Sequence, residues 1–238
     1  MSTLLPRHYL VTVGAILAFA GPVHAATVVF SDDTFANPDW TAAKIVDTTA
    51  GQTATFVAGQ VTSGGNAGAY RQVNHVYDAG IIVVGHAKSG ALYDPAATGA
   101  IVAIAYSYDL IHLDPPPGQA VAYGIALFQG GNVYSTPLDN IFPATWTSFG
   151  ASGLTAANFA LRAGAGPATP DFSATGAPIT FGYASFNHNP GGAPGLTRIS
   201  GIDNWQVTVT TVPVPAAGWL LGTAVAALAA RRLRPQRP

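Results

Sequence analysis

The sequence has 238 residues, no cysteine and 9% charged residues, and its formal net charge is -1 at pH 7. The lack of cysteine excludes a disulfide framework, thiol catalysis and a cysteine metal site. Residues 26–211 hold all eleven acidic residues, every one an aspartate, but only five of the ten basic residues; this acidic balance argues against a nucleic-acid partner.

The N-terminal residues 1–25 have the parts of a secretory signal peptide. A basic residue, Arg7, precedes an apolar stretch, and small residues follow at the two positions that signal peptidase recognises. Cleavage after Ala25 would leave Ala26 as the first residue of the mature protein. The alternative is an uncleaved N-terminal anchor, for which the apolar run is short.

Candidate strands follow one another through residues 26–211, and almost every gap between them contains Gly, Pro, Asn or Asp. Glutamate is absent, and β-branched and aromatic residues are common, as is typical of strands. Residues 155–161 favour a short helix, and residues 187–195 are predicted to form a long polar loop. The predicted strands include 27–31, 44–47, 53–61, 70–77, 81–87, 100–113, 119–129, 179–186 and 202–210.

The closing strand shows the clearest alternation, with Trp205, Val207 and Val209 on one face and polar Gln206 and Thr208 on the other. This is the pattern of a half-buried antiparallel strand. About ten to twelve short strands joined by turns predict an all-β fold, a two-sheet antiparallel β-sandwich of jelly-roll type, as the single domain of the body.

Two short features resemble the concanavalin-like and galactose-binding-like sandwiches of exported bacterial proteins. The first strand leads into an aspartate-rich turn and Trp40, and the closing strand begins with Gly201-Ile202-Asp203-Asn204. The resemblance implies the same sandwich architecture.

The C-terminal segment, residues 212–238, joins a proline-punctuated entry, an apolar run over residues 216–230 and an arginine cluster. That layout predicts a transmembrane helix held by positive charge on the cytoplasmic side. As a helix the run would reach roughly 22 Å against roughly 30 Å of hydrocarbon, and snorkelling arginines can cover part of the difference. The alternative is a buried C-terminal helix of the globular domain.

These three parts in this order resemble the PEP-CTERM protein-sorting signal of Gram-negative bacteria. The resemblance implies export, transient anchoring in the inner membrane, processing by an exosortase, and delivery to the cell surface or extracellular matrix. It also implies that Arg231, Arg232 and Arg234 form the cytoplasmic stop. The residues that match the Val-Pro-x-Pro-Ala-Ala-x-Trp-Leu form of the motif are Val212, Pro213, Pro215, Ala216, Ala217, Trp219 and Leu220.

Aspartates near both ends of the body suggest a structural calcium site. In jelly rolls the first and last strands often lie side by side, which would bring Asp32 and Asp33 near Asp203. Carboxylate and carbonyl oxygens are the ligands that calcium needs. The alternative, which the sequence favours, is that these aspartates cap turns and keep solvated charges. No other cofactor is implied.

A second cluster, residues 109–114, ends in His112-Leu113-Asp114 and would put His112 and Asp114 on one face of a strand. They would then form an acid/base pair or part of a metal site. Because Pro115 follows directly, the plainer interpretation is a strand that ends in polar residues.

Tyrosines on the mid-chain strands and polar groups in the predicted 187–195 loop suggest a carbohydrate-binding surface. Sugar sites combine aromatic rings for stacking with amide and carboxylate groups for hydroxyls. The alternative is that most of these rings fill the core. The candidate glycan-binding residues are Tyr106, Tyr108, Tyr123, Asn187, His188 and Asn189, with further aromatic candidates Tyr70, Tyr93, Tyr134 and Trp146.

No nucleophile elbow, phosphate loop or dinucleotide fingerprint is present, so we expect no enzyme activity. The leading hypothesis is an exported surface protein with a structural or adhesive role in exopolysaccharide or biofilm. The alternative is a lectin-like carbohydrate-binding module, and a third hypothesis is a polysaccharide hydrolase. The expected partners are an exosortase, the inner membrane during sorting, and exopolysaccharide.

Overall fold

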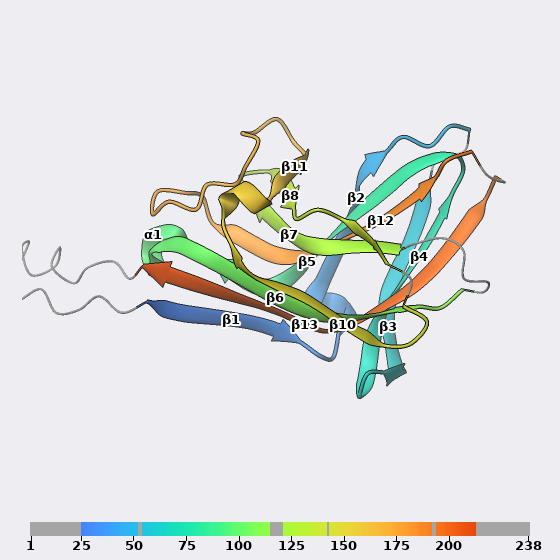
Figure 1. Ribbon diagram of the computed structural model, residues 1–238, viewed down its shortest axis with the longest axis horizontal. Helices are drawn as coiled ribbons and strands as arrows, with labels where there is room; N and C mark the ends of the chain where they lie inside the picture. Colours follow the sequence, from blue (N-terminus) through green and yellow to red (C-terminus); the bar gives the residue numbers. More distant parts are fainter. Residues whose placement is uncertain (1–24, 52–53, 115–120, 142, 192–193, 213–238) are drawn as a thin grey trace, which may run out of the picture. The chain divides into compact units, whose positions relative to one another are not determined.

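The computed structural model describes residues 25–51, 54–114, 121–141, 143–191 and 194–212 (Figure 1). These residues belong to the unit that runs from His24 to Val214. The predicted signal peptide up to residue 24 and the predicted sorting signal from residue 213 onward lie outside the described residues.

The first sheet has six strands in the order β10-β6-β13-β4-β3, and β1 pairs with β13 beside this path. All of its ladders are antiparallel. The strands are β1 (Ala26–Asp32), β3 (Thr55–Gly65), β4 (Gly68–Tyr77), β6 (Ala100–His112), β10 (Thr147–Leu154) and β13 (Leu196–Val212).

The second sheet has seven strands in the order β11-β8-β7-β12-β5-β2, and β9 pairs with β7 beside this path. These ladders are also antiparallel. The strands are β2 (Trp40–Asp47), β5 (Gly80–Tyr93), β7 (Val121–Gln129), β8 (Asn132–Ser135), β9 (Asp139–Ile141), β11 (Ala160–Ala163) and β12 (Ile179–Asn189).

Helical structure is limited, within the described residues, to α1 (Pro95–Thr98) and two 3-10 turns, Asn37–Asp39 and Ala156–Asn158. The predicted all-β, two-sheet antiparallel sandwich is therefore confirmed. Among these residues no helix is both long enough and apolar enough to cross a bilayer.

The helix of one or two turns expected over residues 155–161 is a single 3-10 turn, Ala156–Asn158, and the Thr155 N–H donates to Asn158 Oδ1 at 2.8 Å before β11 begins. One local prediction was wrong. The polar loop expected from residue 187 begins later, because β12 continues to Asn189 and pairs with β5 through Asn189 and Gly80. The backbone hydrogen bonds between β12 and β5 outweigh the preference of Asn187 and Asn189 for turns.

The core lies between the two sheets and is rich in aromatic rings. Trp40 of β2 is its centre: its ring lies 5.3 Å from Tyr183 and 5.4 Å from Trp205, so it joins both sheets. Phe35 stacks on the same indole at 5.4 Å. Each large apolar side chain buried in this way contributes about 1.5–3 kcal/mol.

The first and last described strands lie side by side, as predicted, and Figure 1 shows β1 running along β13. Their ladder runs from Ala26 opposite Thr211 to Asp32 opposite Trp205. Val212, the first residue of the predicted sorting motif, is the last residue of β13 and is paired with Ala100. The sandwich therefore extends one residue beyond the predicted boundary at residue 211.

Candidate functional site

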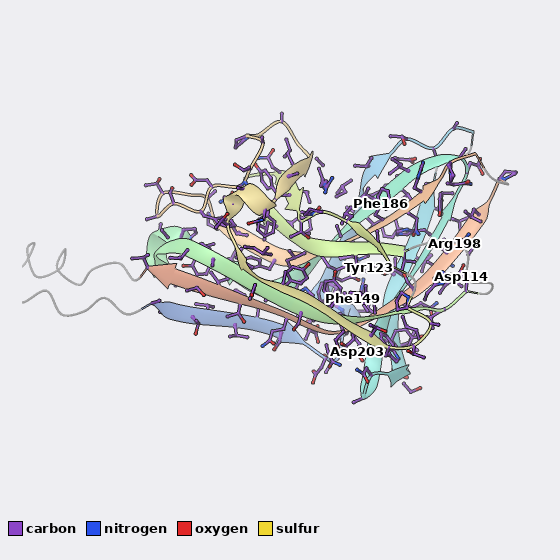
Figure 2. All side chains as sticks on the ribbon, viewed as in Figure 1. Asp114, Tyr123, Phe149, Phe186, Arg198 and Asp203 are labelled. Carbon is purple, nitrogen blue, oxygen red and sulfur yellow. The ribbon has the colours of Figure 1, made fainter. Side chains whose placement is uncertain are left out.

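Polar side chains from three elements meet where the β3–β4 hairpin folds against β6 and β13, close to Asp203 in Figure 2. The backbone N–H of Asn66 donates to Asp203 Oδ2 at 2.7 Å. The side-chain amide nitrogens of Asn66 and Asn204 both donate to Oδ2 of Asp109, at 2.8 and 2.7 Å. We call this group, with two neighbouring aromatic residues, the hairpin site: Asn66, Tyr70, Asp109, Trp146, Asp203 and Asn204.

The backbone of the hairpin site is strained at two positions. Asn204 has φ 49° and Ala67 has φ 78°, both in the left-handed region. Asn204 interrupts the β13–β6 ladder, whose register shifts between Asp203 and Gln206, and its N–H donates to Asp203 Oδ1 at 2.7 Å. Strained residues of this kind persist where surrounding bonds hold them, and they are common at binding sites.

Burial alone raises the pKa of Asp109, but hydrogen bonds from Ser148, Asn204 and Asn66 outweigh it and lower that pKa overall. Asp203 behaves in the opposite way. Burial raises its pKa, two backbone N–H bonds oppose this, and the charges of Asp109 and Asp33 raise it further, so the net shift is upward. Asp109 therefore holds the negative charge that fixes the two asparagine amides.

Two aromatic rings flank these amides. Tyr70 and Trp146 meet edge to face at 5.3 Å, and the indole N–H of Trp146 donates to the Gly64 carbonyl at 2.9 Å. Both rings lie over Gly201 of β13, because a Cβ atom there would come within 2.9 Å of each ring. Glycine is thus required at this position for the rings to rest on the sheet.

The exposed groups of the hairpin site are uncharged and can form hydrogen bonds. Asn66 and Asn204 are exposed and Trp146 is partly exposed, whereas Asp109 and Asp203 are buried. Each amide nitrogen is engaged by Asp109, which orients the amide oxygen away from the carboxylate as an acceptor for hydroxyl groups. The buried carboxylates hold the amides in place, and the indole ring supplies an apolar face.

A second polar group, which we call the inter-sheet polar core, lies between the sheets. His75 Nδ1 donates to Asn187 Oδ1 at 2.8 Å, because an amide oxygen can only accept. His75 Nε2 then accepts from the Ser185 hydroxyl at 3.2 Å, and Ser185 Oγ accepts from His86 Nε2 at 3.1 Å. The group comprises Arg71, His75, His86, Ser185 and Asn187, all at most 3% exposed.

Both histidines of this core are neutral at pH 7. Burial lowers the pKa of His75 to about 4 against a smaller opposing effect of the Asn187 hydrogen bond. Burial, Arg71 and His75 together lower the pKa of His86 well below its ordinary value. Ser185 has hydrogen-bond contacts like those of a hydrolytic nucleophile, but at 1% exposure no substrate reaches it.

Arg71 lies in the same core without a carboxylate partner among the described residues. Its guanidinium lies 5.9 Å from the centre of the Trp40 ring, and Nη2 donates weakly to the Ala58 carbonyl at 3.5 Å. Its Nε and Nη1 atoms have no hydrogen-bond partner within the part of the chain that the structure describes. Among the described residues the guanidinium is therefore faced by the Trp40 ring and a backbone carbonyl rather than by an ion-pair partner.

The predicted His112–Asp114 pair does come together, with His112 Nε2 2.8 Å from Asp114 Oδ1. Arg198 completes the group through Nη1, 3.1 Å from Asp114 Oδ2, and Figure 2 labels this pair near the start of β13. Asp114 also accepts from the Ile199 N–H at 2.8 Å. These bonds tie the end of β6 to β13, so the plainer interpretation, a strand ending in polar residues, fits the contacts.

The predicted calcium ligands do not gather in one place. Asp32 turns inward and accepts from the Trp40 indole at 2.7 Å and from the Phe35 N–H at 2.9 Å. Asp203 belongs to the hairpin site, and Asp33 is exposed near it. Within the described residues no three His, Asp or Glu side chains are placed to hold a metal ion. Turn capping, the alternative, describes Asp32 correctly.

The predicted glycan-binding residues are mostly covered. Tyr108 and Tyr123 are each 3% exposed and belong to the core, and Tyr106 stacks on Tyr108 at 5.5 Å. Asn187 and Asn189 are buried in β12, because that strand replaces the predicted loop. His188, on the opposite face of β12, is exposed.

Sequence reasoning missed Asn66 and Ser148, and it did not connect Asp109 with Asn204. One signal was available, since Ser63-Gly64-Gly65-Asn66 has the composition of a hairpin turn. Which strand the turn would contact depends on sheet order. Trp146 and Tyr70 were among the predicted aromatic candidates, but nothing in the sequence showed that they meet.

A groove of about 350 Å³ lies elsewhere on the described surface, between β1 and the end of the β2–β5 ladder. One side is formed by Val29, Phe30 and Ser31, the other by residues 88–91, and Trp205 lies at its base. This volume is at the lower end of the range for small-molecule sites.

No protein-family model and no curated protein matches this chain. Among solved structures, a xylan-binding CBM22-1 domain from Paenibacillus barcinonensis Xyn10C is 8% identical, with a TM-score of 0.41, over 79% of this chain and 94% of that domain. The mannan-recognising module TmCBM27 is 11% identical, with a TM-score of 0.41, over 77% and 98%. At these values the similarities do not identify a ligand for this chain.

Proposed function

We propose that this protein is an exported, non-enzymatic module that binds neutral polysaccharide outside the cell. The observation that carries the proposal is the hairpin site, where two exposed asparagine amides are fixed by Asp109 beside the ring of Trp146. Pre-oriented amide acceptors and an apolar ring suit sugar hydroxyls and a sugar ring face.

The chemistry of the site favours binding over hydrolysis. A glycosidase needs two carboxyl groups open to the substrate. Here Asp109 and Asp203 are 6% and 1% exposed, and their oxygens accept hydrogen bonds from Asn66, Asn204 and Ser148. The carboxylates are occupied in holding the asparagines.

The place of action remains part of the proposal and rests on the sequence patterns at the two ends. A cleaved signal peptide over residues 1–25 and exosortase processing at the 212–238 segment would deliver the module to the cell surface or matrix. There it would serve the structural or adhesive role in exopolysaccharide or biofilm. Intact-mass analysis of protein from its native host tests this: a mature form starting at Ala26 and cut near Pro215 is expected, and a retained arginine tail would contradict it.

The binding test uses the full chain, purified in mild detergent, titrated calorimetrically with cellohexaose, mannohexaose and xylohexaose. Trp146→Ala removes the stacking surface, and we expect about tenfold weaker binding. Val57→Ala is the control, since Val57 is 71% exposed on β3.

Three results decide the matter. Equal binding by both variants would exclude Trp146 from the site, and no binding of any neutral oligosaccharide by folded protein would remove the proposal. Release of reducing ends that disappears in Asp109→Asn would favour the hydrolase instead.

A further inference from the structure

The groove between β1 and β5 is not explained by the hairpin site. Its β5 side is a large bulge: Ala87 pairs with Gly182 and Leu92 with Thr180, so residues 88–91 lie opposite a single residue of β12. The β2 ladder begins at Lys88, so neither neighbouring strand pairs with residues 89–91. Bulges of this size leave main-chain groups unpaired and re-aim the strand.

The opposite side of the groove is also a free strand edge. Among the described residues β1 pairs with β13 and with no other strand. Val29 and Ser31 are exposed there, and Val29 retains 51% of its accessible surface. The groove thus lies between unpaired backbone on both sides, which supplies N–H and C=O groups to a ligand.

The base of the groove carries a donor without an acceptor. Trp205 is 1% exposed and packs edge to face against Trp40 at 5.4 Å, yet its indole N–H has no hydrogen-bond partner among the described residues. Buried Trp N–H groups usually have one, and leaving the group unsatisfied destabilises the fold. Because the nitrogen atom is itself buried, a ligand oxygen in the groove satisfies it only after a small shift of the indole ring toward the groove.

The charge of the groove argues against an anionic ligand. Lys88 Nζ lies 3.0 Å from Asp39 Oδ2 and 3.3 Å from Asp32 Oδ2, so one cation faces two carboxylates. Burial raises the pKa of Asp32, but the N–H groups of Phe35 and Thr34 and the Trp40 indole lower it to about 2 overall, so this carboxylate is ionised. A neutral ligand is therefore favoured.

The shape of the β5 side argues against an added peptide strand. A strand pairs with regularly spaced N–H and C=O groups. Gly90 has φ 80°, in the left-handed region, and the bulge on either side of it breaks that spacing. Exposed Ser31 and Ser89 instead provide hydroxyls, which suit a partner that both donates and accepts.

We propose that this groove is a second saccharide site, which takes a segment of neutral polysaccharide and offers the Trp205 indole N–H to one of its oxygens. This inference rests on the proposed polysaccharide binding and goes beyond it. With two sites on one sandwich, a single module bridges two chain segments, and polysaccharide is cross-linked rather than only retained.

The test follows the indole N–H signals of the ¹⁵N-tryptophan-labelled full chain in mild detergent by NMR, during titration with the same three hexasaccharides. Trp→Phe variants assign the signals of Trp146 and Trp205. Ser89→Arg fills the groove, and Ser152→Arg, at another exposed serine on β10, is the matched control. Calorimetry gives the stoichiometry in parallel.

We expect one hexasaccharide to shift both indole signals and to bind at two sites per chain. Ser89→Arg should abolish the Trp205 shift, leave the Trp146 shift and halve the stoichiometry, whereas Ser152→Arg should change neither. A shift of the Trp146 signal alone would contradict the saccharide site in the groove and would support the proposed function. A shift of the Trp205 signal alone would support saccharide binding in the groove and contradict binding at the hairpin site. If neither signal shifts, both binding sites are contradicted.

Discussion

The hairpin site and the inter-sheet polar core use similar residue types for opposite purposes. In the hairpin site, buried carboxylates hold exposed amides, and the charge of Asp109 is satisfied by its hydrogen bonds. In the inter-sheet core, neutral histidines and a serine form a closed chain with no exposed member. The first arrangement presents hydrogen-bonding groups to a ligand, and the hydrogen bonds of the second join β4, β5 and β12.

This difference shows how burial changes the role of a polar group. A fully buried group contributes to the fold only while all its partners are present. An exposed group with one buried partner is held in position, yet it keeps a second hydrogen-bonding atom that a ligand can contact.

Lowering the pH should destabilise the inter-sheet core first. The folded-state pKa of His75, about 4, lies below its ordinary 6.5, so the unfolded chain binds more protons between these values. Stability is full above pH 6.5 and falls as the pH drops toward 4, by about 3 kcal/mol from His75 alone. His86 adds to this loss, while the raised pKa of Asp203 acts in the opposite direction.

Urea unfolding of the full chain at pH 7.5, 6, 5 and 4.5 measures this effect. His75→Gln keeps a hydrogen-bonding side chain without the titrating ring and should flatten the pH dependence. An equally steep dependence in His75→Gln would show that other groups cause it.

Ser185→Val should cost about 2–3 kcal/mol of unfolding free energy. The substitution leaves the Nε2 atoms of both histidines without a partner inside a dry core. Saccharide affinity should not change, because no member of this core reaches the hairpin site. Ser152→Val, at an exposed position of β10, is the control and should stay within about 0.5 kcal/mol. A small loss in Ser185→Val would mean that the chain of hydrogen bonds contributes little.

Asp109→Asn should affect binding and stability together. The change removes the charged acceptor shared by Asn66 and Asn204, and we expect a loss of about 1–2 kcal/mol in stability and about tenfold in saccharide affinity. Asp171→Asn is the control, since Asp171 also accepts a hydrogen bond from a serine, here the Ser173 N–H, but is exposed and far from these asparagines in sequence. Unchanged affinity in Asp109→Asn would show that the amides need no fixed carboxylate.

Asn204→Gly should have the smallest effect on stability. Glycine relieves the left-handed backbone at φ 49° but loses the amide contact with Asp109, and the two changes offset each other to within about 1 kcal/mol. Affinity should nevertheless fall several-fold. Thermal unfolding of the sample measures the stability, and calorimetric titration of the same sample measures the saccharide affinity. An unaltered affinity would show that Asn204 is not part of the binding surface.

Local patterns were sufficient to predict several features. The alternation of Trp205, Val207 and Val209 with polar residues predicted a half-buried closing strand, and glycine- and proline-rich gaps predicted a many-stranded sandwich. Asp32 was expected to cap a turn, and it accepts from the N–H groups of Thr34 and Phe35. Each depends on neighbours in the chain, which a sequence displays directly.

Only the tertiary structure decided which polar residues meet. Asn66 and Asp203 are 137 positions apart, and their contact requires that β4 pair with β13 and that the hairpin turn fold over the sheet. The packing of the two sheets buries His75 against Ser185, and pairing with β5 extends β12 through Asn187, where a loop was predicted. Sheet order is set by the combined burial of both sheet faces, a property of all the strands together, so composition and periodicity determined the sandwich while tertiary packing alone chose its sites.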